Sequence, residues 1–157
     1  SPQTAYQITS MLEGVVQRGT GKGLKKLNLD IAGKTGTTNK NTDTWFIGYT
    51  SNLVIGVYIG YDEPRSLGKR ETGAKTAMPV FKEFVESSIN KENARPFKVS
   101  KGIEMMLVDA NTGEKANYLS KNTLIEAFKS KDLKKNFFEP SSNVNYKLRK
   151  NNIFNFY

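Results

Sequence analysis

Apolar residues recur at helical spacing over the first 17 residues of the chain. Ala5, Ile8, Leu12 and Val15 lie three or four positions apart, so they share one face of a helix. Ser1 suits the N-cap position, and the proline after it suits the first helical turn, where its missing N–H would have no partner. The pattern predicts an amphipathic helix that ends at about residue 17, just before three closely spaced glycines.

The middle of the chain has the composition of β-strands. Residues 45–50 and 53–61 are rich in aromatic and β-branched side chains, and only two polar residues separate them, which is typical of an antiparallel hairpin. A further strand is expected over 30–37, so that the three form one meander. The run 53–61 is apolar at nearly every position, which predicts a strand covered on both faces. The Gly- and Lys-rich stretch 22–26 is interpreted as an exposed connection.

A second helix follows the three strands. Residues 62–73 are charged and contain Gly and Pro, so they are expected to form a loop. Thr76 can then cap a helix whose apolar positions continue to Ile89. The elements together predict an α+β fold, in which helices flank a three-stranded antiparallel meander.

The end of the chain is expected to form a small extension. Arg95-Pro96 is interpreted as a boundary between a first unit, residues 1–95, and an extension, residues 96–157. The extension contains a short strand at 103–109 that leads into an Asn-Thr-Gly turn. From about residue 129 it becomes rich in Lys and Asn, which predicts a disordered tail.

Composition limits the chemistry that the chain can perform. The 157 residues contain no Cys and no His, which removes thiol nucleophiles, imidazole bases and the usual zinc ligands, so no metal and no cofactor is expected. The net charge of +9 suggests attraction to polyanions such as nucleic acid, anionic lipid or acidic wall polymers, although a solvated surface rich in Lys and Asn is the favoured explanation. The longest apolar run is far shorter than the roughly 20 residues of a membrane-spanning helix. Because the chain begins with Ser1 rather than Met, it is interpreted as a piece of a longer protein.

The tetrad Lys34-Thr35-Gly36-Thr37 carries the most informative chemistry. A Lys ammonium and hydroxyls on alternate residues can hold a carboxylate from one face of a strand, and a glycine between them lets a substrate approach the backbone. K-T-G elements occur in serine acyl-transferases that bind penicillin, together with a nucleophile in S-x-x-K and an element of S-D-N type. A four-residue match alone fits an ordinary strand end, with an exposed Lys and a turn glycine, equally well. The neighbouring residues therefore decide between this interpretation and a carboxylate-binding site.

The neighbouring residues strengthen the functional interpretation. From about Ser1 to Ile89 the chain resembles the C-terminal part of the transpeptidase domain of class A (bifunctional) penicillin-binding proteins. The strings that carry this resemblance are residues 1–7, 12–21, 33–39, 43–49, and 72–73 with 77–79. Residues 108–113 and 126–129 resemble the C-terminal extension of that family more weakly, and little resemblance is left beyond about residue 130.

The resemblance implies acyl transfer on peptidoglycan. The expected substrate is the D-alanyl-D-alanine end of a stem peptide, from which the last alanine is released while the strand is cross-linked to a neighbour, and β-lactams would mimic this donor. It also implies a β-lactamase-like domain with helices on both faces of the sheet. The expected location is the bacterial cell envelope, at the periplasmic face of the inner membrane, with the membrane anchor and the glycosyltransferase domain outside this chain.

The resemblance also assigns roles to individual residues. Lys34 would supply positive potential to the donor carboxylate and influence proton transfer, and the hydroxyls of Thr35 and Thr37 would bind that carboxylate. The backbone N–H of Thr37 would donate to the oxyanion, while Gly36 would keep the strand edge clear. Trp45 is a candidate to flank the site, although an interpretation as a core aromatic beneath the sheet is favoured.

The serine nucleophile of the family is not expected in this chain. It lies upstream of K-T-G, and neither S-x-x-K nor S-x-N occurs before Lys34. Ser66 and Ser88 fall in S-x-x-K spellings further along, but one is expected in a charged loop and the other at a helix end, so both are interpreted as chance matches. The chain alone is therefore predicted to be inactive, with the missing upstream half as a possible partner.

Two other hypotheses remain open at this point. A basic, non-enzymatic nucleic-acid-binding module would fit the net charge, although no RNA-binding signature or zinc pattern supports it. A fragment of a serine β-lactamase or carboxypeptidase would share the K-T-G element. The string 45–49 and the extension 96–157 argue against that second alternative.

Overall fold

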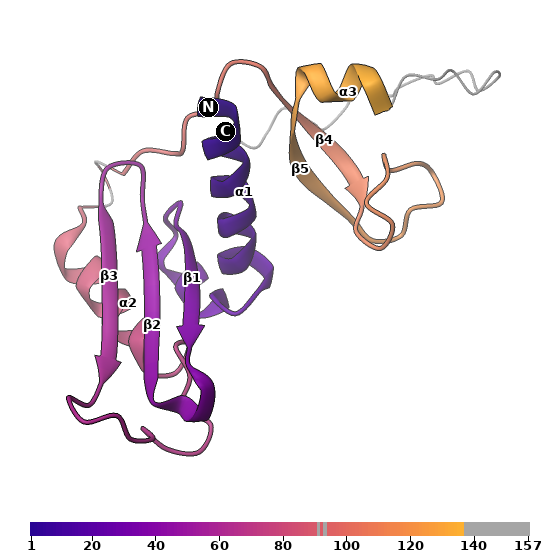
Figure 1. Cartoon of the computed structure of the whole chain (residues 1–157). Coiled ribbons are helices and arrows are strands. Elements are labelled where there is room, and N and C mark those ends of the chain that lie inside the picture. The colour runs from indigo at the N-terminus through magenta and orange to yellow at the C-terminus, as the bar shows by residue number, and fades with distance from the viewer. Residues whose placement is uncertain (91, 93, 137–157) are drawn as a thin grey trace.

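The order of helices and strands confirms the predicted α+β fold (Figure 1). A computed structural model describes residues 1–90, 92 and 94–136. Its helices are α1 (Pro2–Arg18), η1 (Lys22–Leu27), η2 (Asn39–Asn41), α2 (Ala77–Ser88) and α3 (Ser130–Asn136), where η marks a 3-10 helix. Its strands are β1 (Ala32–Thr37), β2 (Asp43–Tyr49), β3 (Val54–Gly60), β4 (Ile103–Asp109) and β5 (Thr123–Lys129).

The first three strands form the predicted antiparallel meander. They lie in the order β1-β2-β3, so β2 is central and β1 is an edge strand of the described sheet. In the register, Thr35 lies opposite Phe46, and Phe46 lies opposite Val57. Figure 1 shows α1 beside β1 and α2 behind the sheet. As predicted, the Ser1 hydroxyl caps α1 by accepting from the N–H of Thr4 at 3.3 Å.

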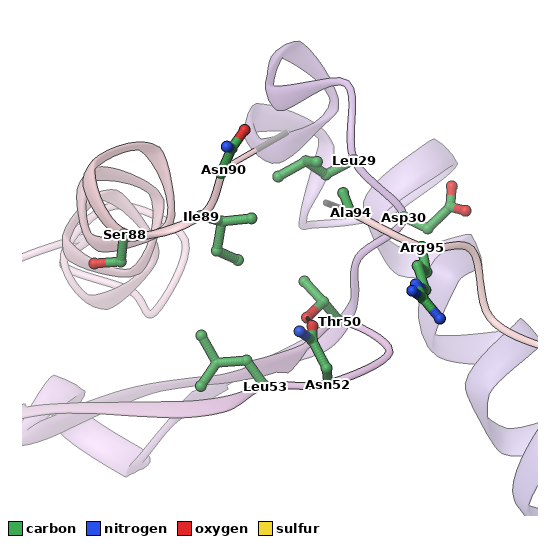
Figure 2. A pocket seen from close by; sticks show the side chains of 10 residues that line it. All are labelled: Leu29, Asp30, Thr50, Asn52, Leu53, Ser88, Ile89, Asn90, Ala94 and Arg95. Carbon is green, nitrogen blue, oxygen red and sulfur yellow. Dashed lines mark hydrogen bonds between the residues drawn. The ribbon is translucent and has the colours of Figure 1, made fainter. Parts of the chain in front are cut away.

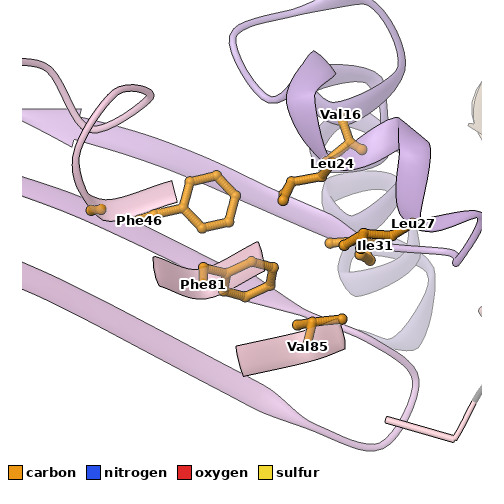
Figure 3. Packing of buried hydrophobic residues seen from close by; sticks show 8 residues of the cluster. Val16, Leu24, Leu27, Ile31, Phe46, Phe81 and Val85 are labelled. Carbon is orange, nitrogen blue, oxygen red and sulfur yellow. The ribbon is translucent and has the colours of Figure 1, made fainter. Parts of the chain in front are cut away.

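The core lies between the sheet and α2 (Figure 3). The Phe46 and Phe81 rings meet edge to face with centroids 4.7 Å apart, and both side chains are fully buried. Close packing extends from this pair toward α1 and η1. The buried members of the cluster are Val16, Leu24, Leu27, Ile31, Phe46, Ala77, Phe81 and Val85.

The prediction of an exposed connection at 22–26 holds for its lysines and is wrong for Leu24. This segment forms η1, and its Leu24 and Leu27 are fully buried. The two leucines are three residues apart, so a 3-10 helix places them on the same face, toward the core, and its lysines on the solvent side. The segment therefore belongs to the core that supports β1.

The prediction that β3 is covered on both faces is also wrong. Exposure alternates along the strand: Val54 is 71% exposed and Tyr58 49% exposed, whereas Ile55 and Val57 are partly buried against the core. On the same face, Ile47 of β2 is 50% exposed. The helix α2 covers only the Phe46 face, so the continuous apolarity of 53–61 does not reflect two covered faces in this chain.

The extension packs against α1 through polar contacts. Strands β4 and β5 form a separate antiparallel pair. The Gln7 amide donates to the carbonyl of Ala127 at 3.0 Å, and the Arg18 guanidinium forms an ion pair with Glu126 at 2.9 Å. A division into two units near residue 95 stays a prediction.

The predicted disordered tail differs from the structure at its start. Residues 130–136 form the helix α3, which begins where the N–H of Ser130 donates to the carbonyl of Gly102, and Leu133 is buried. One buried side chain thus anchors a segment whose composition is otherwise polar. The rest of the tail, 137–157, lies outside the described residues. No helix in the described part of the chain has the length and apolar character needed to span a bilayer.

Candidate functional site

The tetrad lies on β1, with one side of the strand open. The N–H of Thr38 donates to the carbonyl of Asp43 at 3.0 Å, immediately after the last residue pair of the β1–β2 ladder. Hydrogen-bonded and non-hydrogen-bonded pairs alternate along an antiparallel ladder. The backbone N–H groups of Thr35 and Thr37 therefore turn away from β2, toward the open side. This edge is the backbone surface that a bound substrate can reach.

The sequence suggested that Lys34 and Thr35 act from one face of the strand, but their side chains begin on opposite faces. Lys34 lies opposite Ile47, on the exposed face of the sheet, whereas Thr35 lies opposite Phe46. Consecutive strand residues point to opposite faces, so the two side chains start apart. The long Lys34 side chain turns across the edge instead, and its Nζ donates to the Thr35 carbonyl oxygen at 2.9 Å and reaches Oγ1 at 3.5 Å. The ammonium and the hydroxyl thus meet at the open edge.

Thr37 is exposed and its hydroxyl is already oriented. Its Oγ1 accepts a hydrogen bond from the backbone N–H of Gly73 at 3.1 Å. A hydroxyl has one proton and two lone pairs, so this contact leaves the proton available for another acceptor. The loop before α2 therefore contributes to the site by orienting the last hydroxyl of the tetrad.

Trp45 borders the tetrad on the exposed face of the sheet. It lies opposite Gly36, where an added Cβ would come within 3.2 Å of the Trp45 Cβ. The Trp45 side chain is 41% exposed and packs against the Tyr58 ring at a centroid distance of 4.8 Å. The favoured interpretation of Trp45 as a core aromatic is therefore wrong, since the next residue, Phe46, fills that place.

Tyr58 ties this aromatic pair to the start of β2. Its hydroxyl donates to Asp43 Oδ1 at 2.7 Å. Hydrogen bonds from Tyr58 and then Thr42 lower the pKa of the Asp43 carboxyl, and the bond to Asp43 raises the pKa of Tyr58. Asp43 also accepts from Thr38 at 3.3 Å, so one carboxylate ties the turn after β1 to the aromatic pair.

Two residues outside the tetrad had no role in the sequence interpretation. Thr20 follows α1, and its Oγ1 lies 3.1 Å from the Thr35 Oγ1. Glu13 of α1 is half-buried, and desolvation together with the charge of Asp30 raises its pKa to about 7. The Gly-Thr-Gly string at 19–21 was a visible signal for Thr20, but no pattern in the sequence marks Glu13.

The two S-x-x-K serines lie in the places predicted for chance matches. Ser66 is exposed in the loop after β3, where its Oγ accepts from the N–H of Gly68 at 3.2 Å. Ser88 is the exposed last residue of α2. No hydrogen bond within the described part of the chain joins either serine to a lysine that could activate it.

A hollow of the surface lies away from the tetrad (Figure 2). This pocket, of about 350 Å³, is lined by residues that precede β1, join β2 to β3, or lie at or just after the end of α2, including Asp30, Thr50 and Ser88. In the ladder, Ala32 at the start of β1 pairs with Tyr49, whereas Thr37 pairs with Thr44 at the other end of β2. The pocket and the tetrad therefore lie at opposite ends of the sheet.

Comparison with known proteins decides the family. Residues 1–86, more than half of the chain, match the family described as the penicillin binding protein transpeptidase domain. The chain belongs to this family. The family match confirms the resemblance seen in the sequence and leaves the nucleic-acid-binding alternative without support.

Several relatives in this transpeptidase family are similar over most of the chain. Penicillin-binding protein 1A of Rickettsia conorii is 47% identical over 124 residues, which is 79% of this chain and 15% of that protein. Penicillin-binding protein 1A of Rickettsia bellii is 41% identical over 151 residues, 96% of this chain and 18% of that protein. The chain thus spans less than a fifth of the length of these curated relatives.

A solved structure of the same family has a similar fold. The crystal structure of penicillin-binding protein 1A from Haemophilus influenzae superposes with a TM-score of 0.72 at 30% sequence identity. The match covers 82% of this chain and 20% of that one. The structural match therefore extends beyond residues 1–86 and into the extension, because 82% of the chain is more than residues 1–95.

Proposed function

We propose that this chain forms the donor-binding wall of a peptidoglycan D,D-transpeptidase. The observation that carries the proposal is the meeting of the Lys34 ammonium and the Thr35 hydroxyl at the open edge of β1, two residues before an outward-facing N–H at Thr37. A positive charge, a hydroxyl and a backbone donor at one edge are suited to a substrate that presents a carboxylate and a reacting carbonyl side by side. The D-alanyl-D-alanine terminus of a stem peptide and the β-lactam that imitates it both have this form.

Each residue of the tetrad has a distinct part in this proposal. Lys34 attracts the terminal carboxylate, and the Thr35 and Thr37 hydroxyls donate to it. The Thr37 N–H donates to the oxyanion that develops on the attacked carbonyl, a contribution whose loss typically costs about 100- to 1000-fold in rate. Gly36 leaves the edge free of side-chain bulk, and Trp45 borders the site on the sheet face.

The nucleophilic serine is supplied from outside these 157 residues in this proposal. Ser66 and Ser88 have exposed positions, and no activating lysine is among their hydrogen-bond partners in the described part of the chain. Binding of the donor carboxylate and acylation are therefore separable, and this chain performs only the first. Location at the periplasmic face of the inner membrane follows from the proposed substrate, which is cell-wall peptidoglycan.

The binding half of the proposal can be tested on the isolated chain by NMR. We expect N-acetyl-D-Ala-D-Ala to shift the backbone amide signals of residues 34–37 with a Kd on the order of 1 mM, as befits a few exposed hydrogen bonds. Lys34→Gln should weaken this binding. Lys26→Gln, which removes the same charge from an exposed position on η1, should leave it unchanged. Titration without shifts at 34–37 would contradict the donor-binding role.

Fluorescent penicillin tests the second half of the proposal. The isolated chain should show no covalent labelling after denaturation, because no serine with an activating lysine stands beside the tetrad among the residues that the structure describes. Labelling that survives denaturation would mean that the chain does contain a nucleophile. Double variants of Ser66 and Ser88 to Ala would then identify or exclude the two S-x-x-K serines.

A further inference from the structure

Two glycines hold Thr20 tightly against the end of α1. The N–H groups of Gly19 and Gly21 both donate to the carbonyl of Val15, at 3.0 and 2.9 Å. An added Cβ at Gly19 would lie 3.0 Å from the Val15 Cα, and one at Gly21 would lie 3.1 Å from the Val15 carbonyl oxygen. Side chains at either position would press on backbone, so the close turn favours glycine on both sides of Thr20. The Gly-Thr-Gly string therefore fixes where the Thr20 side chain stands.

The Thr20 hydroxyl stands beside the carboxylate-binding hydroxyl of the tetrad. Its Oγ1 lies 3.1 Å from the Oγ1 of Thr35, and the Lys34 Nζ lies 3.5 Å from that same oxygen. Thr20 is exposed and Thr35 is partly buried, so a ligand at the open edge can approach this group of three. Fifteen residues of sequence separate the two threonines, and no pattern local to the tetrad indicates the contact.

The arrangement leaves the single proton of Thr35 available to a ligand when Thr20 is the donor of the hydrogen bond between them. A threonine hydroxyl can accept two hydrogen bonds and donate one. When Thr20 and Lys34 both donate to the Thr35 oxygen, the Thr35 proton is left for a third group. Hydrogen bonds in such a chain strengthen one another, so a donating Thr20 makes Thr35 a better donor.

We propose that Thr20 is a positioning residue of the carboxylate site, which sets the Thr35 hydroxyl as a donor to the ligand. The proposal rests on the proposed function, because it names a further residue of the same site. A carboxylate accepts hydrogen bonds only, and therefore benefits from a Thr35 hydroxyl that is held as a donor. A carboxamide in the same place offers donors of its own, and benefits little.

The test compares two ligands on four variants of the 157-residue chain. N-acetyl-D-Ala-D-Ala and its C-terminal amide are titrated by NMR against the wild type, Thr20→Val, Thr20→Ser and Thr9→Val. Thr9 is a matched control, since it lies on α1 and makes one hydroxyl contact, with the Tyr49 hydroxyl at 3.0 Å. Thr20→Ala replaces the valine variant if circular dichroism shows that the latter is not folded.

The expected result is a loss of affinity that is selective for the carboxylate ligand. Thr20→Val should raise the Kd of the carboxylate ligand by about threefold to tenfold, the effect of one hydrogen bond, and change the Kd of the amide by less than twofold. Thr20→Ser should retain the wild-type Kd because it keeps the hydroxyl. Thr9→Val should bind both ligands as the wild type does.

The other outcomes separate failure of this inference from failure of the proposed function. Equal carboxylate binding by the wild type and Thr20→Val, or equal weakening of both ligands, would overturn the positioning role while leaving the donor-binding wall in place. Weaker binding of the carboxylate ligand by Thr20→Ser than by the wild type would also overturn the positioning role. A wild type that binds neither ligand at 34–37 would overturn the proposed function, and the role of Thr20 with it.

Discussion

Gly73 connects the stability of the fold to the geometry of the tetrad. It precedes α2 and packs on the backbone of β1 and β2, where its N–H donates to the Thr37 hydroxyl at 3.1 Å. An alanine Cβ at this position would lie 2.3 Å from the carbonyl oxygen of Trp45 and 2.7 Å from that of Gly36. Both obstacles are backbone atoms inside the sheet, so they cannot move aside as the end of a flexible side chain could. Gly73→Ala must therefore push the loop away from the tetrad.

The cost of this displacement follows from two contributions. Overpacking a well-packed region costs about 1 to 3 kcal/mol. Loss of the hydrogen bond to Thr37 adds about 1 kcal/mol. Gly73→Ala should therefore lower the free energy of unfolding by about 2 to 4 kcal/mol, a large part of the 5 to 15 kcal/mol typical of a domain.

Urea unfolding measures this effect, with fluorescence of the single tryptophan, Trp45, as the probe. For a slope of about 2 kcal/mol per M, the midpoint should fall by roughly 1 to 2 M. Gly56→Ala is the matched control, because an added Cβ there would meet no atom closer than the Ile47 Cγ1, at 4.0 Å. The control should change stability by less than about 0.5 kcal/mol. Equal midpoints for Gly73→Ala and Gly56→Ala would refute the reasoning.

Three further predictions concern the core, a buried carboxyl and the extension. Phe81→Ala should lower the free energy of unfolding by about 3 to 5 kcal/mol in the same urea assay, because it empties the fully buried place opposite the Phe46 ring. Glu13 has a folded pKa of about 7, raised from 4.5, so the folded state keeps a proton that the unfolded state releases between these values, and stability is lost as pH rises through that window. Glu13→Gln should therefore be more stable than the wild type by about 1 kcal/mol at pH 8 and by little at pH 4, as measured by thermal melts. This figure is below the full linkage value because the side chain is only partly buried and solvent screens its charge. Equal gains in stability at both pH values would contradict the prediction. Arg18→Ala removes a partly exposed ion pair with Glu126 and should cost less than about 1 kcal/mol, an effect that 0.5 M NaCl should largely abolish and that a double-mutant cycle with Glu126→Ala measures.

Secondary structure was largely predictable because its signals are local. The Ser1 cap, the β-branched strands and the glycine breaks act over a few residues, and the structure has α1, β2 and β3 within about two residues of their predicted bounds. Which face of a strand is covered by other elements is not decided by nearby residues. The run 53–61 is apolar on both faces, but which face α2 covers depends on a helix that begins 17 residues after β3 ends. The sequence pattern could not distinguish a face covered within this chain from one left open.

The candidate site shows the same limit more sharply. The tetrad names the residue types of an anion site, but Lys34 and Thr35 start on opposite faces, so alternation along the strand argues against their meeting. They meet because β1 is an edge strand, around which a long Lys side chain can turn. The hydroxyls beside them are oriented from elsewhere: Thr35 contacts Thr20 at the end of α1, and Thr37 accepts from Gly73 before α2. Since these partners lie 15 and 36 residues from the tetrad threonines, the direction in which each hydroxyl can donate is a property of the fold and not of the motif.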